Sequence, residues 1–166
     1  MKKNILLSLL SAAIFSMSVM AQKENANRNI KFGIGAVVGL PLSTHKIIEG
    51  MAYEAGLLAE FPQTELVSIT GSASYFGFTA KNGVQVEGGA IPVLIGAKIK
   101  IAGNVYGHAQ AGVSFVTASG GGSAFSYSPS LGYQLSRNID ISLRYFAMTK
   151  NQITESYISL RAGFTF

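Results

Sequence analysis

Apolar and polar residues alternate one by one along most of the chain after residue 29. An alternation with a period of two is typical of β-strands that have one apolar face and one polar face. Eight segments follow this pattern, and turn-forming residues such as Gly, Pro, Asn and Ser separate them. The predicted strands are 30–42, 51–61, 66–78, 90–101, 105–116, 123–135, 139–147 and 157–166. The pattern therefore predicts an all-β fold.

The segments that connect the predicted strands alternate between short and long. The short connections are 62–64, 102–104 and 136–138, and the long ones are 43–50, 79–89, 117–122 and 148–156. Short turns at one end and longer loops at the other are typical of an outer-membrane barrel. Both chain ends then lie at the short-turn end, which faces the periplasm in such barrels.

The two faces of the predicted strands differ in residue type. The polar face is mostly Gly and Ser and carries few charges, whereas the surface of a soluble domain carries many. The apolar face has aliphatic residues in the middle of the strands and aromatic residues toward both ends. Those toward the long loops are Tyr53, Tyr75, Phe115, Phe125, Tyr127 and Tyr145, and those toward the short turns are Phe32, Phe61, Tyr133, Phe164 and Phe166. Two aromatic rings of this kind predict that the apolar face meets lipid.

Composition agrees with a barrel in lipid but leaves an alternative open. Only 13% of residues are charged and the mean hydropathy is +0.33, whereas about a quarter of residues are charged in soluble domains. No stretch after residue 22 has the roughly 18 apolar residues that a transmembrane helix needs.

In lipid every backbone group must be paired, so the last strand must close on the first. We expect an eight-stranded, antiparallel, up-and-down transmembrane β-barrel. The alternative is a soluble, lipocalin-like barrel that binds an apolar ligand.

The first residues have the features of a cleavable signal peptide. Lys2 and Lys3 precede an apolar run over 5–20, and Ala21 supplies a small residue for cleavage. The alternative is an N-terminal membrane anchor. We expect residues 1–21 to be the signal peptide, 22–29 a short polar segment, and 30–166 the barrel.

Several charged residues fall on the polar face and are predicted to point into the barrel. An unpaired charge in a narrow interior is costly, so these residues should pair. By position they form one cluster near the short turns, with Glu60, Lys98, Lys100 and Asp140, and one nearer the middle, with Glu54, Arg144 and Arg161. Because eight strands leave no room for an aqueous channel, we expect these clusters to plug the lumen. The alternative is an ion path that opens when the charges change partners.

Other chemistry finds little support in the sequence. There is no Cys, and the two His residues are isolated, with His45 in a predicted loop and His108 on the polar face of a strand. This pattern predicts no disulfide, no metal site and no other cofactor. The basic residues are scattered, although the formal net charge is +5, so no nucleic-acid partner is expected.

The chain resembles the small outer-membrane β-barrel family, which includes the OmpA-like and OmpX-like eight-stranded barrels. The resemblance covers 30–166 and rests on the alternating strands, the leader and the C-terminal sequence LRAGFTF, residues 160–166. Strand segments such as IPVLIGAKIKI, residues 91–101, are also similar to this family. In the family, a C-terminal segment of this kind is the signal that the barrel assembly machinery recognises. Gly163, Phe164 and Phe166 match that signal.

The resemblance implies an integral protein of the bacterial outer membrane. Its expected partners are outer-membrane lipid and, during insertion, the barrel assembly machinery, and we expect it to be a monomer. The expected role is structural, or adhesion and host contact through the loops, without enzymatic activity. Some small outer-membrane barrels modify lipid A with a Ser, a His and an acidic residue. For a lipid-A-modifying enzyme, the strands of this chain offer only His108. No nucleophile is placed beside it.

Overall fold

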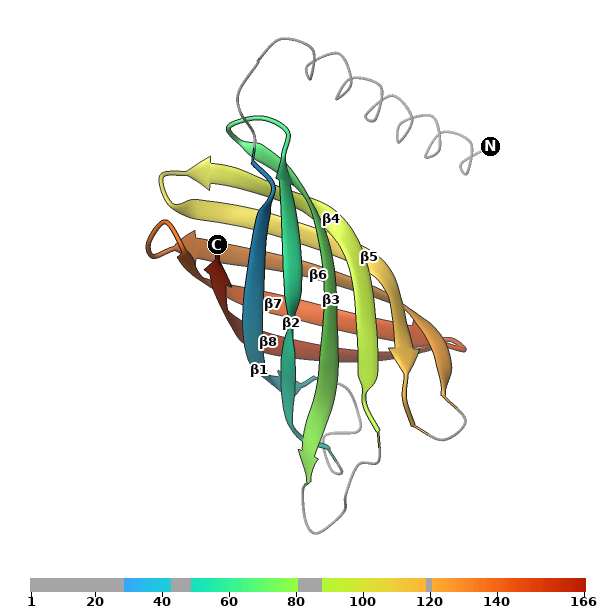
Figure 1. Ribbon diagram of the computed structural model, residues 1–166. Coiled ribbons are helices and arrows are strands. Elements are labelled where there is room, and N and C mark those ends of the chain that lie inside the picture. Colours follow the sequence, from blue (N-terminus) through green and yellow to red (C-terminus); the bar gives the residue numbers. More distant parts are fainter. Residues whose placement is uncertain (1–28, 43–48, 81–87, 119–120) are drawn as a thin grey trace, which may run out of the picture.

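The computed structural model describes residues 29–42, 49–80, 88–118 and 121–166 (Figure 1). Within these ranges eight strands form one closed barrel, in which each strand pairs with its neighbours in the sequence. The strands are β1 (Lys31–Pro41), β2 (Glu49–Pro62), β3 (Val67–Ala80), β4 (Ala90–Ala102), β5 (Val105–Val116), β6 (Gly122–Gln134), β7 (Ile139–Lys150) and β8 (Ile153–Thr165). The predicted fold class is therefore confirmed. The predicted signal peptide, 1–21, and most of the segment 22–29 lie outside the described residues.

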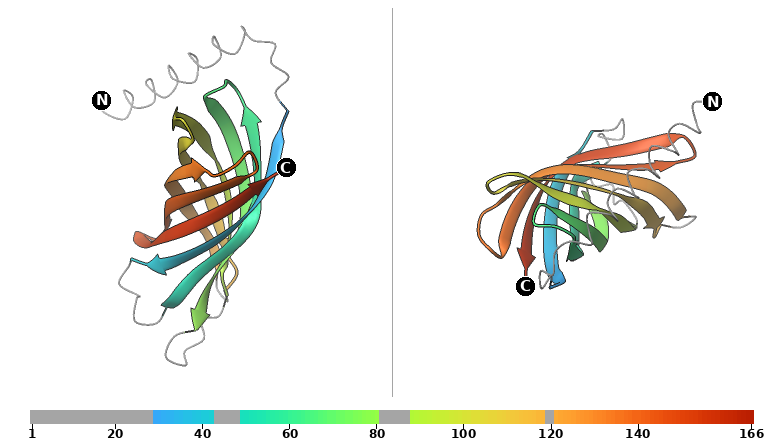
Figure 2. Two further views of the ribbon diagram at one scale, coloured as in Figure 1. Left: turned by 90° about the vertical axis from the view of Figure 1, so that its left-hand side faces the viewer. Right: turned by 90° about the horizontal axis from the view of Figure 1, so that it is seen from above.

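The barrel closes where the first strand pairs with the last. β1 and β8 are antiparallel, with a register that runs from Gly33 opposite Thr165 to Pro41 opposite Tyr157. Beyond this ladder the backbone N–H of Phe166 donates to the carbonyl oxygen of Phe32 at 2.8 Å. The two strands lie side by side in the views of Figures 1 and 2. Phe166 thus continues the pairing between the two strands beyond the ladder.

The predicted long connection at 148–156 is wrong. β7 continues to Lys150 and β8 begins at Ile153, so only Asn151 and Gln152 connect them. These two residues have φ angles of 49° and 68°, as in the two-residue turns that join twisted hairpin strands. The sequence prediction missed this hairpin because both faces are polar here. Its tip is paired by two such polar side chains, those of Thr149 and Thr154, whose hydroxyl oxygens are 2.9 Å apart.

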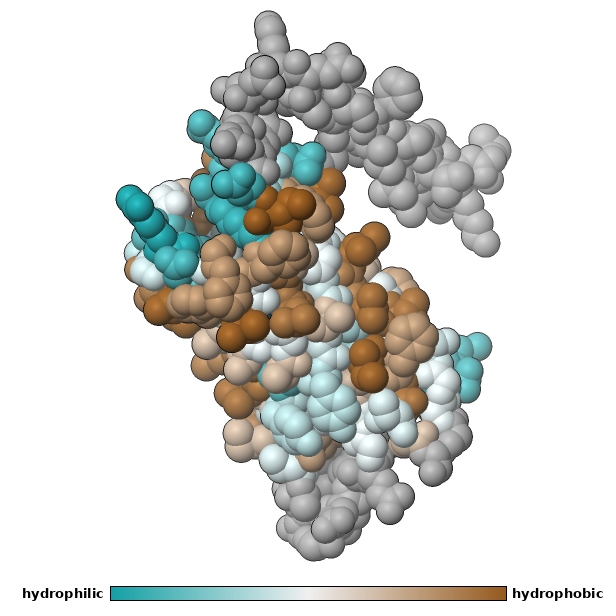
Figure 3. Space-filling view, in the orientation of Figure 1, coloured by the Kyte–Doolittle hydropathy of each residue, from teal (hydrophilic) through white to brown (hydrophobic). Residues whose placement is uncertain are grey.

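The apolar face of the strands points outward and the polar face points inward. Ile95, Leu143 and Phe164 are 72%, 53% and 41% exposed, whereas Glu54 and Arg144 are 9% and 5% exposed. Figure 3 shows apolar side chains over the outer surface of the strands. A soluble barrel would have the opposite arrangement, with its charges outside. The lipocalin-like alternative is therefore contradicted.

Aromatic side chains on the outer face lie toward both ends of the strands. Toward the loops these are Tyr53, Tyr75, Phe115, Phe125 and Tyr127, and toward the short turns Phe32, Phe61, Tyr133, Phe164 and Phe166. Some of the rings contact one another, since the ring centroids of Phe164 and Phe166 are 5.3 Å apart. Among the described residues, no helix is long and apolar enough to cross a membrane.

Candidate functional site

The interior of the barrel holds the charged residues that the alternation placed on the polar face. Three ion pairs form among the described residues: Lys98 Nζ to Glu60 Oε2 at 3.2 Å, Arg144 Nη1 to Glu54 Oε2 at 2.7 Å, and Arg161 Nη1 to Asp140 Oδ2 at 2.8 Å. The structure therefore brings six of the seven predicted residues into the lumen as neutral pairs. The seventh, Lys100, is exposed at the end of β4 and belongs to none of the three pairs.

The pair nearest the short turns has two further partners. Glu60 accepts a hydrogen bond from the Ser68 hydroxyl at 2.8 Å, so both of its carboxylate oxygens are used. The Lys98 ammonium lies 4.4 Å from the centroid of the Tyr106 ring, which is a favourable cation–π distance. These contacts offset the free-energy cost of removing both charged groups from water.

A second pair at the same end is built around Asp140. This carboxylate accepts hydrogen bonds from the Tyr106 hydroxyl and from Arg161. Two glycines leave the space that these side chains occupy. A Cβ on Gly132 would lie 2.2 Å from the Tyr106 ring, and a Cβ on Gly163 would lie 2.4 Å from Asp140 Oδ1. Gly163, which the sequence assigned to the assembly signal, thus also has a packing role in the lumen.

The third pair lies deeper in the barrel. Arg144 uses Nη1 for Glu54 and donates from Nε to the Ser128 hydroxyl at 2.5 Å. Its guanidinium group also lies 4.9 Å from the centroid of the Phe146 ring. Ser128, Arg144 and Glu54 are 2%, 5% and 9% exposed, so all three side chains are buried.

The pairing differs from the predicted clusters in two respects. Arg161 pairs with Asp140 near the short turns and not with Glu54 in the middle. Lys100 is exposed and joins none of the three ion pairs. Because Asp140 is opposite Gly163 in the register of β7 and β8, it lies diagonally across from Arg161. The alternation predicts which residues point inward. It does not predict how far neighbouring strands are shifted along each other, and this shift determines which inward side chains become diagonal partners.

Uncharged polar side chains fill the rest of the middle. His108 Nε2 lies 2.9 Å from the Thr70 hydroxyl oxygen, and Gln110 donates to Ser72 at 2.9 Å. His108 thus points into the barrel, as its place on the polar face predicts, and Thr70 is its partner there. His45 lies outside the described residues. Among the described residues no three His, Cys, Asp or Glu side chains gather closely enough to hold a metal ion.

The space left among these groups is small. A cavity of about 40 Å³ lies between the His108 and Gln110 side chains and the Glu54–Arg144 pair. That volume suits individual water molecules.

Toward the loops the interior changes from polar to apolar. The rings of Phe76 and Tyr157 have centroids 5.1 Å apart, and those of Phe76 and Phe146 are 5.5 Å apart. Leu94 packs into the same cluster and is 1% exposed. This aromatic layer consists of Phe76, Leu94, Phe146 and Tyr157, and it forms a second barrier across the barrel. All four side chains occupy inward positions in the alternation of β3, β4, β7 and β8.

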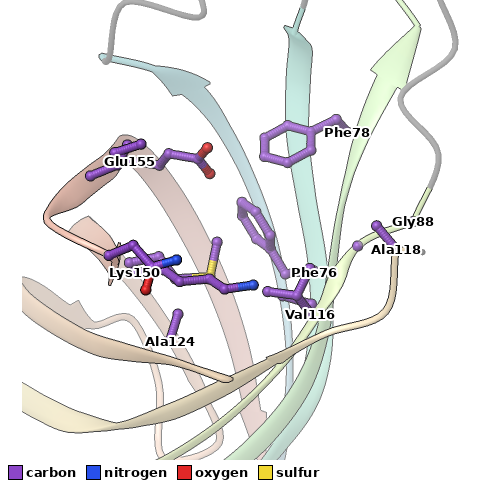
Figure 4. Close-up of a pocket in the computed structure, with 13 residues that line it drawn as sticks. Phe76, Phe78, Gly88, Val116, Ala118, Ala124, Lys150 and Glu155 are labelled. Carbon is purple, nitrogen blue, oxygen red and sulfur yellow. The ribbon is translucent and has the colours of Figure 1, made fainter. Parts of the chain in front are cut away.

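Outside the aromatic layer a cavity of about 440 Å³ lies at the loop end of the barrel (Figure 4). Most of its lining is apolar, and the two charged side chains are Lys150 and Glu155. Sequence reasoning missed this cavity. The only signal was the occurrence of large apolar residues at inward positions near the loop ends of β3 and β7.

Comparisons with known proteins show the fold. No family model matches the chain, and no curated protein matches it. Among solved structures, Ail, the attachment invasion locus protein of Yersinia pestis, is 15% identical with a TM-score of 0.57, and the match covers 85% of this chain and 100% of Ail. The N-terminal β-barrel domain of Pseudomonas aeruginosa OprF is 14% identical with a TM-score of 0.53, covering 82% of this chain and 97% of that domain.

The outer membrane enzyme PagL is 17% identical with a TM-score of 0.56, and the match covers 80% of this chain and 98% of PagL. Proteins with different roles thus share this barrel, so the likeness concerns fold and not activity. The chain has the fold of the small outer-membrane β-barrels, which confirms the resemblance seen in the sequence.

Proposed function

We propose that this protein is an integral, monomeric β-barrel of the bacterial outer membrane that supports the membrane or makes surface contacts through its loops. The observation that carries the proposal is the inverted arrangement of side chains. Large apolar residues cover the outside of the barrel, and the ion pairs lie within it. Soluble monomers rarely expose contiguous apolar patches above a few hundred Å², whereas lipid requires such a surface.

The proposed role does not involve transport of ions. The lumen is crossed by neutral ion pairs and then by the aromatic layer. Eight-stranded barrels have an interior just wide enough for side chains. In this proposal the barrel acts as a membrane anchor that carries the loops.

The proposed orientation has the short turns and both chain ends in the periplasm. The longer connections at residues 42–48, 81–89 and 117–121 then face the cell exterior. Insertion in this direction depends on the C-terminal segment with Phe164 and Phe166 as the signal for the barrel assembly machinery. Phe166 is 71% exposed, so its side chain is available to a partner during assembly.

Contact with other molecules is proposed for the loops rather than for the strands. The similar protein Ail is described as an attachment invasion locus protein, and a crystal structure of it contains a heparin analogue, sucrose octasulfate. That similarity supports a surface-contact role for this barrel.

We propose no enzymatic role, although PagL is an enzyme with the same fold. The one described histidine, His108, lies inside the barrel beside Thr70, away from the lipid-facing surface where a lipid substrate would lie. Mass spectrometry of lipid A from cells with and without the protein tests this point. Unchanged lipid A supports the proposal, and a modification that disappears in His108→Ala would contradict it.

Location and orientation can be tested together. The protein is expected to fractionate with outer membranes, to require detergent for extraction, and to be absent from osmotic-shock fluid. An epitope tag inserted within residues 81–87 should be labelled by antibody on intact cells. The same tag in the turn at Gly103 should be labelled only after the outer membrane is permeabilised. Labelling of the Gly103 tag on intact cells would contradict the orientation.

The role itself is tested with a deletion strain. A structural role predicts weakened membrane integrity, measured as increased sensitivity to detergent, in cells that lack the protein. A surface-contact role predicts reduced adhesion without that sensitivity, and restoring the barrel with its loops shortened should not recover adhesion. A deletion strain with normal membranes, normal adhesion and a changed lipid profile would contradict both roles.

A further inference from the structure

The cavity at the loop end differs from the rest of the lumen. Deeper layers contain ion pairs and hydrogen-bonded hydroxyl side chains, such as the Arg144–Glu54 pair and the Ser114–Ser126 contact. The cavity is lined instead by Phe76, Phe78, Ala90, Val116, Ala124 and Met148, among others. Its volume of about 440 Å³ lies within the range of about 300–1,000 Å³ that is typical of small-molecule sites.

The aromatic layer bounds the inner end of this cavity. Phe76 is 3% exposed, while Phe146 and Tyr157 are each 1% exposed. Phe78 continues the layer upward, with its ring perpendicular to that of Phe76 and 5.0 Å from it. A molecule that enters from the loop end would therefore meet apolar side chains on its walls and at its base, and it would not pass through the barrel.

Two charged side chains, those of Lys150 and Glu155, line the cavity. In Figure 4 the Lys150 side chain extends across the cavity toward Phe76 and Val116, and Glu155 lies on the side away from Phe78. The Lys150 ammonium donates one hydrogen bond to the carbonyl oxygen of Gly121. An ammonium group has three donors, so two remain for a ligand. The Glu155 carboxylate already accepts a hydrogen bond from the Tyr157 hydroxyl at 3.3 Å.

From this geometry we propose that the loop-end cavity binds a small single-chain amphiphile with an anionic head group, such as a medium-chain fatty acid. The alkyl chain packs against Phe76, Phe78 and Met148, and the carboxylate is bound by Lys150. The inference goes beyond the role proposed for the loops and does not depend on it, because only inward side chains of the strands carry it. It assigns the protein a capacity to hold an apolar compound at the cell surface.

The two methionines downstream of residue 21, Met51 and Met148, provide a direct test. Met148 lines the cavity, whereas Met51 is 50% exposed on the outer face of β2. The mature barrel is labelled with [¹³C-methyl]methionine, placed in lipid nanodiscs and titrated with sodium octanoate. Saturable movement of the Met148 signal with an unchanged Met51 signal is the expected result. Equal movement of both signals would mean that octanoate only enters the bilayer, and this would overturn the proposal, as would a Met148 signal that does not move.

Variants and ligands then test the two halves of the site. Lys150→Met should weaken octanoate binding about tenfold, as expected for the loss of a charge-assisted contact, and should leave binding of neutral octanol unchanged. Ala124→Leu, which fills the cavity, should abolish the Met148 response to both compounds. Ala36→Leu, on the outer face, is the matched control and should change neither. Tighter binding of octylamine than of octanoate would overturn the assignment of an anionic head group.

Discussion

Arg144 on β7 and Glu54 on β2 form an ion pair inside the barrel, with Nη1 2.7 Å from Oε2. In the closed sheet these strands are separated by β8 and β1, so the pair links non-neighbouring walls of the lumen. Both side chains are less than a tenth exposed. A pair in this position links two walls of the barrel, and its contribution to the free energy of unfolding can be measured.

Removal of one member of this pair should destabilise the barrel strongly. Glu54→Gln leaves the Arg144 charge buried without its counter-ion, which costs about 3–5 kcal/mol in other proteins. The free energy of unfolding in lipid vesicles, measured with urea, checks this value. The control is Lys100→Met at the exposed end of β4, which should change stability by less than about 0.5 kcal/mol.

The double variant Glu54→Leu with Arg144→Met should recover most of that loss. Two apolar side chains of similar size often replace a buried ion pair without net cost. If the double variant is as unstable as the sum of the single variants, the two residues do not act as a pair.

Gly163→Ala should disturb the Asp140–Arg161 pair. The added Cβ would lie 2.4 Å from Asp140 Oδ1 and 2.5 Å from Arg161 Nη1, so the pair must shift. Overpacking of this kind costs about 1–3 kcal/mol. Gly71→Ala is the matched control, because its Cβ would have no neighbour within 4 Å. Equal stability of the two variants in urea titrations would show that Gly163 has no packing role.

The lumen should not conduct ions. Purified protein inserted into a planar bilayer should give no steady current, because the ion pairs and the aromatic layer close the interior at two depths. Glu54→Leu with Arg144→Met should also remain closed, since Phe76 and Phe146 still form the outer barrier. A steady ohmic conductance from the unmodified protein would contradict the plugged lumen and favour the ion path.

The terminal Phe166 should matter more for assembly than for stability. Its backbone N–H closes the seam with Phe32 whatever side chain it carries. Phe166→Ala is therefore expected to reduce the amount of barrel assembled in cells several-fold. The control is Phe32→Ala, which removes a ring of comparable exposure from the neighbouring strand. Both purified variants should lose similar stability on refolding, and only Phe166→Ala should assemble poorly. Equal assembly of the two variants would contradict a role of Phe166 as a signal.

The period-two pattern was enough to predict the strands and their two faces. The segment predicted at 105–116 is β5 as observed, and the segment predicted at 90–101 is β4 without its last residue. Both strands alternate clearly, and β4 is flanked by Gly89 and Gly103. The pattern failed at 148–156, where polar residues on both faces conceal the alternation and only the backbone geometry of Asn151 and Gln152 reveals a hairpin.

The interior was less predictable than the strands. Alternation determines whether a residue such as Arg161 points inward, but its partner depends on the stagger between strands, which the alternation does not encode. The loop-end cavity depends on the same stagger, since it forms where Phe76 and Met148 come to lie at a similar height from different strands. Which side chains meet at the ion pairs and at the cavity therefore depends on how the strands lie relative to one another.

The central claim is that the barrel's outer face lies in lipid, and a single tryptophan tests it most directly because the chain has none. Ile95→Trp, on the outer face, should be quenched strongly by lipids brominated near the bilayer centre and hardly at all by iodide in the water. Phe76→Trp, at a buried inward position, should resist both quenchers. The claim would be contradicted if Ile95→Trp were quenched by iodide and unaffected by brominated lipid.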